Sequence, residues 1–195
     1  MPIYAIDQHI PVVDASSFIH PSAEIIGDVI IGANCYIGPN AVIRGDFGRI
    51  IIEKNSNVQD TCVIHSFPGG DCILHHHSHV GHGAVLHGCI LEADCLIGMN
   101  AVIMDNSTIG AQSIVAASSF VKANSQFDKR SLIVGTPAKV MRQVSDSEIS
   151  WKQKGTAEYI KLAQRARDSL REVTPLPQVE ADRPRYNQSS HRPKS

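Results

Sequence analysis

Aliphatic residues recur at every sixth position along most of the first 121 residues of the chain. Two unbroken series share this spacing: Ile19, Ile25, Ile31, Ile37 and Ile43, and then Leu91, Ile97, Ile103, Ile109, Val115 and Val121. Two shorter pairs lie between them, Val58 with Ile64 and Val80 with Leu86. A period of six is neither helical nor a long alternating strand, so it predicts one short strand and one corner per repeat. Three repeats would close a triangular coil of about 18 residues, and stacked coils would share a core that no single coil could bury.

Two interruptions of this period predict insertions at the edge of the all-β solenoid. The first lies near Phe47-Gly48-Arg49. The second covers about residues 66–79, where Pro68, Gly69 and Gly70 favour turns. Loops on one edge of a solenoid are a common place for function, so the residues beside these interruptions are candidates for a site.

The hydrophobic pattern changes after Val121, and a helix is expected near the C-terminal end. Residues 132–139 are predicted to lead out of the solenoid, and Ser145 with Glu148 three residues later is the signature of a capping box. An apolar stripe predicts that the helix packs along the β-helix, with any break falling near Gly155: Ile149, Tyr159, Ile160, Ala163, Ala166 and Leu170. We expect a β-helix domain over residues 1–140, the helix within 141–180, and a flexible tail over 181–195.

Composition narrows the possible partners. Lys and Arg total 18 while Asp and Glu total 19, and so nearly neutral a chain is not expected to bind nucleic acid. No apolar run approaches the ~20 residues that cross a bilayer. The N-terminus lacks the pattern of a signal peptide, so we expect a cytoplasmic protein without membrane association. The five cysteines form no CxxC pair, and we interpret them as buried small residues rather than as catalytic or metal-bound thiols.

Three histidines are candidates for a metal site. His65 and His87 are 22 residues apart. One coil accounts for about 18 of these and the loop after His65 for the rest, so both can lie at one edge on neighbouring coils. His82 precedes His87 by five residues, or about 16 Å of extended chain. Because Zn–N bonds are only about 2.1 Å long, His82 is expected to reach the metal of a neighbouring subunit, which predicts a homotrimer with metal sites at its interfaces. The alternative is that all three are polar edge residues.

Several polar motifs surround these histidines. In chain order they are Arg44-Gly45-Asp46, Asn57-Val58-Gln59-Asp60, His65, and Gly81-His82-Gly83-Ala84-Val85-Leu86-His87-Gly88. Their order and spacing resemble those of the γ-class carbonic anhydrases over most of residues 10–140. The resemblance implies a left-handed parallel β-helix of hexapeptide repeats, a fold also found in bacterial acyltransferases. It further implies zinc, or iron or cobalt in the same site, bound by His65, His82 and His87.

The same resemblance implies roles for the neighbouring polar residues. Gln59 would hydrogen-bond a metal-bound water, Arg44 and Asp60 would pair across the subunit interface, and Asp46 would support the site. Simpler alternatives are an ordinary surface pair between Arg44 and Asp46 and a polar corner residue at Gln59. Three imidazole ligands leave a coordination position open for water, and the metal lowers the pKa of that water towards neutrality.

Two departures from the family pattern bear on the reaction. Phe47 stands where these enzymes carry a glutamate, and the loop of residues 66–71 contains no glutamate. In the family such glutamates export protons, and fast CO2 hydration requires that step. His75, His76, His77 or His79 could replace them, or they could be solvated loop residues.

Further segments are shared with one branch of that family. They include Met1-Pro2-Ile3-Tyr4, Gly98-Met99-Asn100-Ala101-Val102 and Leu132-Ile133-Val134-Gly135. This branch is similar to the PaaY group of phenylacetate degradation and the related CaiE group of carnitine metabolism. This similarity implies a metal-dependent thioesterase that acts on acyl-CoA. Tyr159 would either donate a hydrogen bond near the site or serve only in packing. A γ-class carbonic anhydrase and a non-catalytic trimeric accessory protein of CoA metabolism stay open. An acyltransferase is disfavoured, because that branch uses a lone catalytic histidine.

Overall fold

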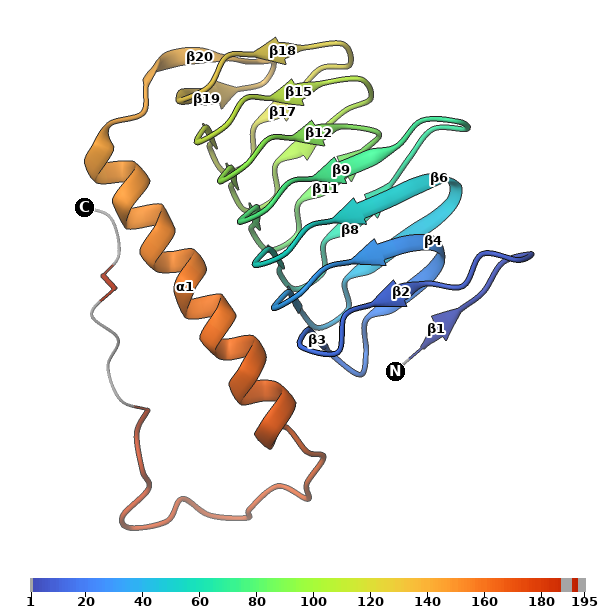
Figure 1. Ribbon diagram of the computed structural model, residues 1–195. Coiled ribbons are helices and arrows are strands. Elements are labelled where there is room, and N and C mark those ends of the chain that lie inside the picture. The colour runs from blue at the N-terminus through green and yellow to red at the C-terminus, as the bar shows by residue number, and fades with distance from the viewer. Residues whose placement is uncertain (1, 187–190, 193–195) are drawn as a thin grey trace.

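Short parallel strands stack into a triangular β-helix, and one long helix lies alongside it (Figure 1). The computed structural model describes residues 2–186, 191 and 192. The face beneath the helix consists of β3 (Phe18–Ile19), β5 (Tyr36–Ile37), β7 (Asn57–Val58), β10 (His79–Val80), β13 (Leu96–Ile97), β16 (Ile114–Val115) and β19 (Ser131–Gly135). An antiparallel strand, β20 (Ala138–Gln143), closes this face at its last coil.

The other two faces share two long strands that turn a corner, β4 (Glu24–Ile31) and β6 (Val42–Ile52). The second face continues from them through β8 (Val63–His65), β11 (Val85–His87), β14 (Val102–Ile103) and β17 (Phe120–Val121), and β1 (Ile3–Tyr4) pairs with β4 at its start. The third face holds β2 (Val12–Val13), β9 (Cys72–Leu74), β12 (Ile90–Leu91), β15 (Thr108–Ile109) and β18 (Gln126–Phe127).

The aliphatic residues of the six-residue period form the core, which confirms the predicted parallel β-helix. On the second face Ile43 stacks on Ile64, Ile64 on Leu86, and Leu86 on Ile103, and all four are fully buried. The five cysteines are also buried and free, as expected. Each coil therefore supplies only part of a core that runs through the whole stack.

Corners between strands take a left-handed backbone conformation, and asparagine fills many of them. Asn34, Asn40, Asn100, Asn106 and Asn124 all have φ between 56° and 62°. Asparagine tolerates this region better than most non-glycine residues because its side chain is short and polar. The regular corners explain why the period continues through segments that contain no glycine.

Two insertions enlarge the edge that carries His65. The first lies between Arg44 and Ile50, where the register of β6 against β4 shifts. The second lies between β8 and β9 and therefore covers only residues 66–71. The prediction of a loop as far as residue 79 is wrong: residues 72–80 include β9 and β10, with Leu74 and Val80 buried as in any other coil. Four consecutive polar residues at the corner, His75 to Ser78, conceal this regular coil in the sequence.

The two insertions touch at Gly48. A Cβ at this position would lie 1.9 Å from the carbonyl oxygen of Gly70, so the backbone of one insertion would have to move. We expect Gly48→Ala to lower the free energy of unfolding by about 1–3 kcal/mol, measured by chemical denaturation. Gly70→Ala is the matched control, because its Cβ would meet nothing nearer than 3.4 Å. Equal losses in the two variants would contradict this explanation.

The helix α1 (Asp146–Ser169) begins as predicted, with Ser145 and Glu148 forming a capping box. It runs unbroken through Gly155, because a single glycine costs only about 1 kcal/mol relative to alanine. Part of the predicted apolar stripe packs as expected, since Tyr159, Ala163 and Ala166 lie against Phe18 and Tyr36. The rest of the buried face is polar: Glu148, Lys152 and Thr156 are buried as well. Leu170 lies beyond the helix and is 51% exposed.

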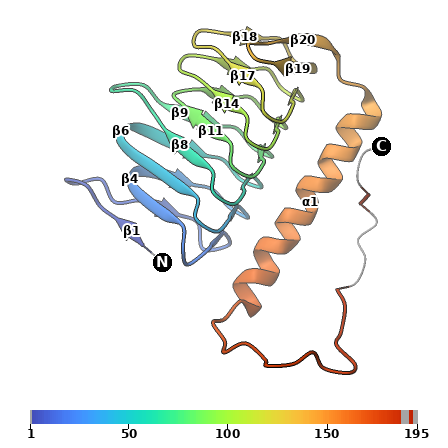
Figure 2. The same ribbon diagram turned by 180° about the vertical axis from the view of Figure 1, so that it is seen from behind.

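The helix runs beside the face of β3, β5 and β7, from the last coils back towards the first (Figure 2). The expected domain boundary after residue 140 falls inside β20. The expected flexible tail lies partly outside the described residues. Within the described residues, no helix is long and apolar enough to span a bilayer.

Candidate active site

His65 and His87 lie side by side at the enlarged edge. They end the adjacent strands β8 and β11 and are paired in register. The Nδ1 atom of His65 is 3.2 Å from the Nε2 atom of His87. Two nitrogen ligands of a tetrahedral ion with Zn–N bonds of about 2.1 Å would be about 3.4 Å apart. The spacing of the pair therefore fits two adjacent ligands of one metal ion.

A carboxylate holds the other nitrogen of each imidazole. His65 Nε2 is 2.8 Å from Asp46 Oδ1, and His87 Nδ1 is 2.6 Å from Asp105 Oδ1. An N–H directed at a carboxylate leaves the opposite nitrogen with a lone pair for a metal. A carboxylate behind a metal-binding histidine is common at zinc sites, so both histidines are placed as metal ligands usually are.

Asp46 also accepts from Arg44, whose Nη1 atom lies 2.5 Å from Asp46 Oδ2. Burial opposes ionisation of Asp46, but hydrogen bonds from His65 and Arg44 outweigh it and lower the pKa of this carboxyl. Asp46 therefore stays ionised near neutral pH. The ring of Phe47 lies 5.4 Å from that of His65, at an exposed position of the edge.

His82 lies at a different corner of the coil. Its Nδ1 atom is 3.2 Å from Asp60 Oδ2. Within the described part of one chain, no three His, Cys, Asp or Glu side chains are close enough to hold a metal ion. One subunit thus brings two of the three candidate histidines together and keeps the third apart. Arg44 and Asp60 likewise take separate partners within the chain, Asp46 and His82.

Gln59 belongs to a polar group beneath α1, on the side of His82. Its Nε2 atom is 2.7 Å from His79 Nε2 and 3.1 Å from Asn57 Oδ1. Burial and the nearby charge of Lys152 lower the pKa of His79 to about 3, so its imidazole is neutral and can accept from Gln59. The ring of Tyr159 lies 5.2 Å from that of His79, and burial raises the pKa of Tyr159 to about 12. Gln59 and Tyr159 are thus neighbours, apart from the pair of His65 and His87 in their own chain.

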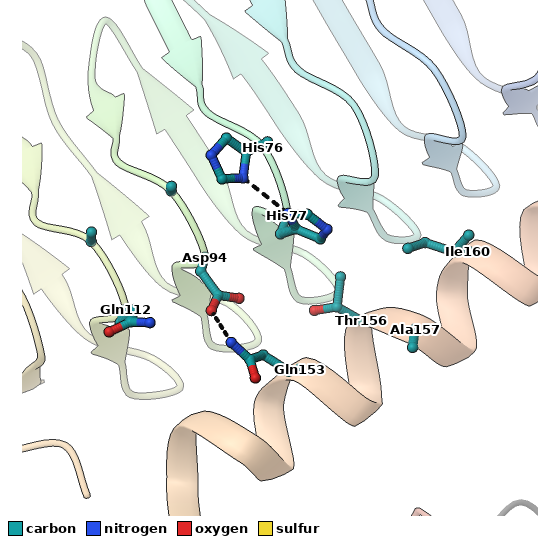
Figure 3. A pocket seen from close by; sticks show the side chains of 10 residues that line it. His76, His77, Asp94, Gln112, Gln153, Thr156, Ala157 and Ile160 are labelled. Atoms are coloured by element: carbon teal, nitrogen blue, oxygen red, sulfur yellow. Dashed lines mark hydrogen bonds between the residues drawn. The ribbon is translucent and has the colours of Figure 1, made fainter. Parts of the chain in front are cut away.

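Two of the cavities that border α1 lie on opposite sides of the helix. One, named here the His82 cavity, has a volume of about 370 Å³ and is lined by Gln59, His79, His82, Met99, Ala117, Trp151 and Tyr159, among others. The other lies on the opposite side of α1, has a volume of about 460 Å³, and is lined by His76, His77, Asp94, Gln112 and Gln153, among others (Figure 3). The His82 cavity contains three residues of the candidate active site, Gln59, His82 and Tyr159.

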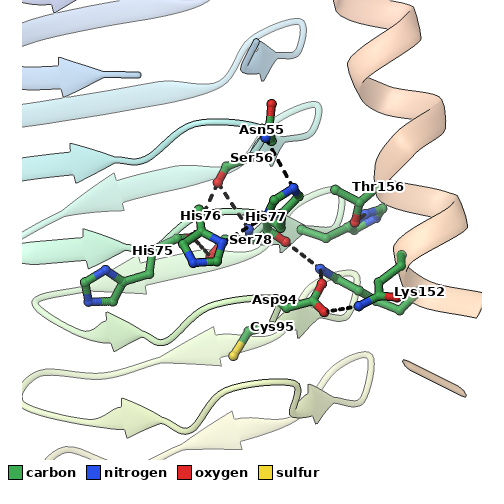
Figure 4. Close-up of polar contacts among 12 residues, drawn as sticks. Asn55, Ser56, His75, His76, His77, Ser78, Asp94, Cys95, Lys152 and Thr156 are labelled. Carbon is green, nitrogen blue, oxygen red and sulfur yellow. Dashed lines mark hydrogen bonds and ion pairs between the residues drawn. The ribbon is translucent and has the colours of Figure 1, made fainter. Parts of the chain in front are cut away.

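A buried lysine joins α1 to the β-helix. Lys152 Nζ lies 2.6 Å from Asp94 Oδ1 and 2.5 Å from the carbonyl oxygen of His77 (Figure 4). Burial lowers the pKa of Lys152, while the attraction of Asp94 opposes that change. Gln153 binds the second oxygen of Asp94 at 2.7 Å. These contacts hold the helix against the coil corners.

The other histidines of the polar corner point elsewhere. His75 Nδ1 lies 3.0 Å from Glu53 Oε1, and His77 Nε2 lies 3.2 Å from Asn55 Nδ2. Both contacts tie them to the corner of the preceding coil. These side chains therefore belong to a corner other than that of His65 and His87.

Sequence reasoning missed Asp105 and Lys152. Asp105 follows His87 by 18 residues, one regular coil, so stacking the sequence in coils would have placed it beside that histidine. Lys152 shares a helical face with Glu148 and Thr156, and no apolar stripe could reveal it.

Comparisons with known proteins agree with the fold. Residues 11–45 and 88–123 match the model of the bacterial transferase hexapeptide family, which comprises six repeats. The carnitine operon protein CaiE of Salmonella newport (strain SL254) is 54% identical over 196 residues, covering 100% of this chain and 99% of that protein. CaiE of Salmonella enteritidis PT4 (strain P125109) matches equally well.

Two solved structures are similar over most of the chain. A putative acetyltransferase of Bacillus cereus superimposes with a TM-score of 0.84 at 34% identity, covering 85% of this chain and 96% of that one. A hexapeptide transferase family protein of Anaplasma phagocytophilum gives a TM-score of 0.81 at 33% identity, covering 84% and 96%. The repeat pattern, the coil geometry and these full-length similarities together show that the chain belongs to the acyltransferase-like hexapeptide-repeat family and is homologous to CaiE.

Proposed function

We propose that the protein is a metal-dependent hydrolase of acyl-CoA thioesters that acts as a homotrimer. The observation that carries the proposal is the pair of His65 and His87, whose facing nitrogens are 3.2 Å apart while carboxylates hold their other nitrogens. Two histidines alone make an incomplete zinc site, because catalytic zinc sites usually have three protein ligands and one open position. His82 of a neighbouring subunit is the proposed third ligand.

Zinc, iron or cobalt fits this set of donors. When bound, such an ion supplies Lewis-acid chemistry: it lowers the pKa of a water molecule and stabilises negative charge on a carbonyl oxygen. The protein's part is orientation. Asp46 and Asp105 fix the two imidazoles, Arg44 fixes Asp46, and Phe47 packs beside the ring of His65.

Gln59 and Tyr159 would act on the substrate side, next to His82. Because His79 and Asn57 occupy the amide nitrogen of Gln59, its oxygen is the atom left to position a water molecule. Tyr159 stays protonated near neutral pH and keeps a hydroxyl for donation. A thiol has a pKa of about 8.5, so the thiolate leaves without a strong acid. The proposed reaction therefore needs no carboxylic acid beside the leaving group.

The test is a panel of acyl-CoA esters, including phenylacetyl-CoA and acetyl-CoA, assayed with zinc, iron or cobalt and after chelation. CO2 hydration is measured on the same sample by stopped flow. We expect thioester hydrolysis that disappears on chelation and returns with metal, together with a trimeric mass in solution. CO2 hydration without thioester hydrolysis would instead identify a carbonic anhydrase. Full biological activity of a metal-free preparation would identify a non-catalytic accessory protein.

Asp105→Asn tests the role of the carboxylate behind His87. Loss of such a partner typically costs about 10–100-fold in metal affinity or activity, and we expect a loss in that range, measured by competition with a chelator. Asp14→Asn is the matched control, since Asp14 only caps a turn through Ser16, with the backbone nitrogen at 2.8 Å. A metal affinity equal to that of the control would argue against a ligand role for His87.

A further inference from the structure

The His82 cavity has walls suited to an uncharged, apolar group. Met99 and Ala117 line it from corners of successive coils, and Trp151 and Tyr159 line it from α1. Its volume of about 370 Å³ lies within the usual range for small-molecule sites, which is about 300–1,000 Å³. Aromatic faces and a thioether pack well against flat or flexible apolar groups.

The ionisable side chains in these walls have partners. His82 Nδ1 lies 3.2 Å from Asp60 Oδ2, and the ring of His191 lies 5.3 Å from that of Trp151. Lys152 pairs with Asp94 at 2.6 Å, and Glu158 pairs with Lys161 at 3.1 Å. A phosphate entering the cavity would lose its hydration without gaining an unpaired cation, which is unfavourable. An uncharged group pays no such cost. The nucleotide and phosphates of coenzyme A are therefore expected to remain outside.

The β-helix contributes three polar side chains to the cavity wall, those of Gln59, His79 and His82. Gln59 and His79 are bonded to each other at 2.7 Å, and His82 also borders the cavity. His79 is neutral, so this polar part adds no positive charge of its own near neutral pH. A molecule with an apolar group and one adjoining carbonyl matches a cavity lined by apolar side chains together with these three polar ones.

We infer that the His82 cavity binds the acyl group of the thioester, with its carbonyl directed towards His82 and coenzyme A extending outwards. The inference rests on the proposed function, because His82 would complete the metal site of the neighbouring subunit. The helix α1 then forms part of the acyl-binding wall, and the subunit that contributes His82 also selects the acyl group. A cavity on the far side of α1 has no such connection to His82.

Binding can be measured without turnover, because Trp151 is the only tryptophan in the chain and lines this cavity. The probe is S-benzyl-coenzyme A, a thioether that cannot be hydrolysed. We expect it to change the fluorescence of Trp151 in a saturable way, and coenzyme A alone to leave the fluorescence unchanged. Ala117→Leu fills part of the cavity and should weaken binding of the probe by at least about fivefold.

Ala111→Leu is the matched control. Ala111 lies one corner earlier on the same coil and lines the other cavity, so the same added volume should leave probe binding unchanged. Met99→Ala, which removes wall area without adding bulk, should also weaken binding. Only variants that keep the wild-type midpoint of thermal unfolding and the mass of a trimer are compared. Equal affinity in Ala117→Leu and Ala111→Leu, or an equal response to coenzyme A alone, would overturn the assignment.

Turnover separates this inference from the proposed function. Ala117→Leu should raise the KM for phenylacetyl-CoA more than that for acetyl-CoA. If Ala117→Leu hydrolysed both esters with an unchanged ratio of the two KM values, the acyl cavity would be contradicted, while the proposed thioesterase activity would not. Saturable binding of S-benzyl-coenzyme A by a protein that hydrolyses no thioester would support the cavity and contradict the proposed reaction.

Discussion

A one-to-one mixture of the His82→Ala and His87→Ala variants, each inactive alone, is expected to recover about a quarter of wild-type thioesterase activity after subunit exchange. His87→Ala destroys the donor pair of its own subunit but keeps His82, while His82→Ala does the reverse. In a cyclic trimer that contains both kinds of subunit, one junction of the three joins an intact pair to an intact His82. Activity and bound metal are measured before and after exchange, with mixed trimers identified by native mass spectrometry.

Mixing His65→Ala with His87→Ala is the matched control. Both changes damage the same pair, which lies within one chain, so no arrangement of subunits restores an intact site. Recovery in this control, or none in the first mixture despite mixed trimers, would contradict a site shared between subunits. The contrast depends only on which residues the chain brings together by itself.

Replacing Lys152 by alanine is expected to lower the free energy of unfolding by about 3–5 kcal/mol. The ammonium group is buried, pairs with Asp94 and donates to the carbonyl oxygen of His77. Its removal leaves Asp94, whose side chain is 12% exposed, beside Gln153 but without its cationic partner, and a largely buried carboxylate without a counter-charge is costly. The midpoint of chemical denaturation, at fixed protein concentration, measures the loss.

Lys154→Ala controls for charge and helix propensity. Lys154 lies on the same helix but is exposed, so its replacement should change stability by less than about 0.5 kcal/mol. Limited proteolysis should also cut α1 faster in Lys152→Ala than in Lys154→Ala. If the two variants behaved alike, the buried ion pair would not be what holds the helix in place.

Much of the solenoid could be predicted because every inward-facing position of the repeat requires a buried aliphatic residue. Ile25 and Ile43, or Ile97 and Val115, meet one coil apart, so spacing alone identifies the core and the relative height of His65 and His87. The end of the second insertion could not be predicted. The corner from His75 to Ser78 contains no aliphatic residue, although its backbone is as regular as that of any other corner.

The surroundings of the candidate site were predicted less completely, because they depend on side chains from different coils and from the helix. The contact of Asp105 with His87 follows from the coil period only when polar residues are stacked as carefully as aliphatic ones. The burial of Lys152 depends on how α1 lies across the coil corners, and a lone lysine in a helix ordinarily indicates a solvent-exposed face.

A stack of coils in which each touches only its neighbours would be expected to fray from either end, one coil at a time. Here α1 joins the two ends. Arg130, near the last coil, pairs with Asp146 at the start of the helix, and Arg167 near its end donates to the carbonyl oxygen of Ser16 at 2.7 Å. Loss of a terminal coil must therefore release part of the helix as well. This long-range connection favours loss of the whole stack in a single cooperative step over gradual shortening.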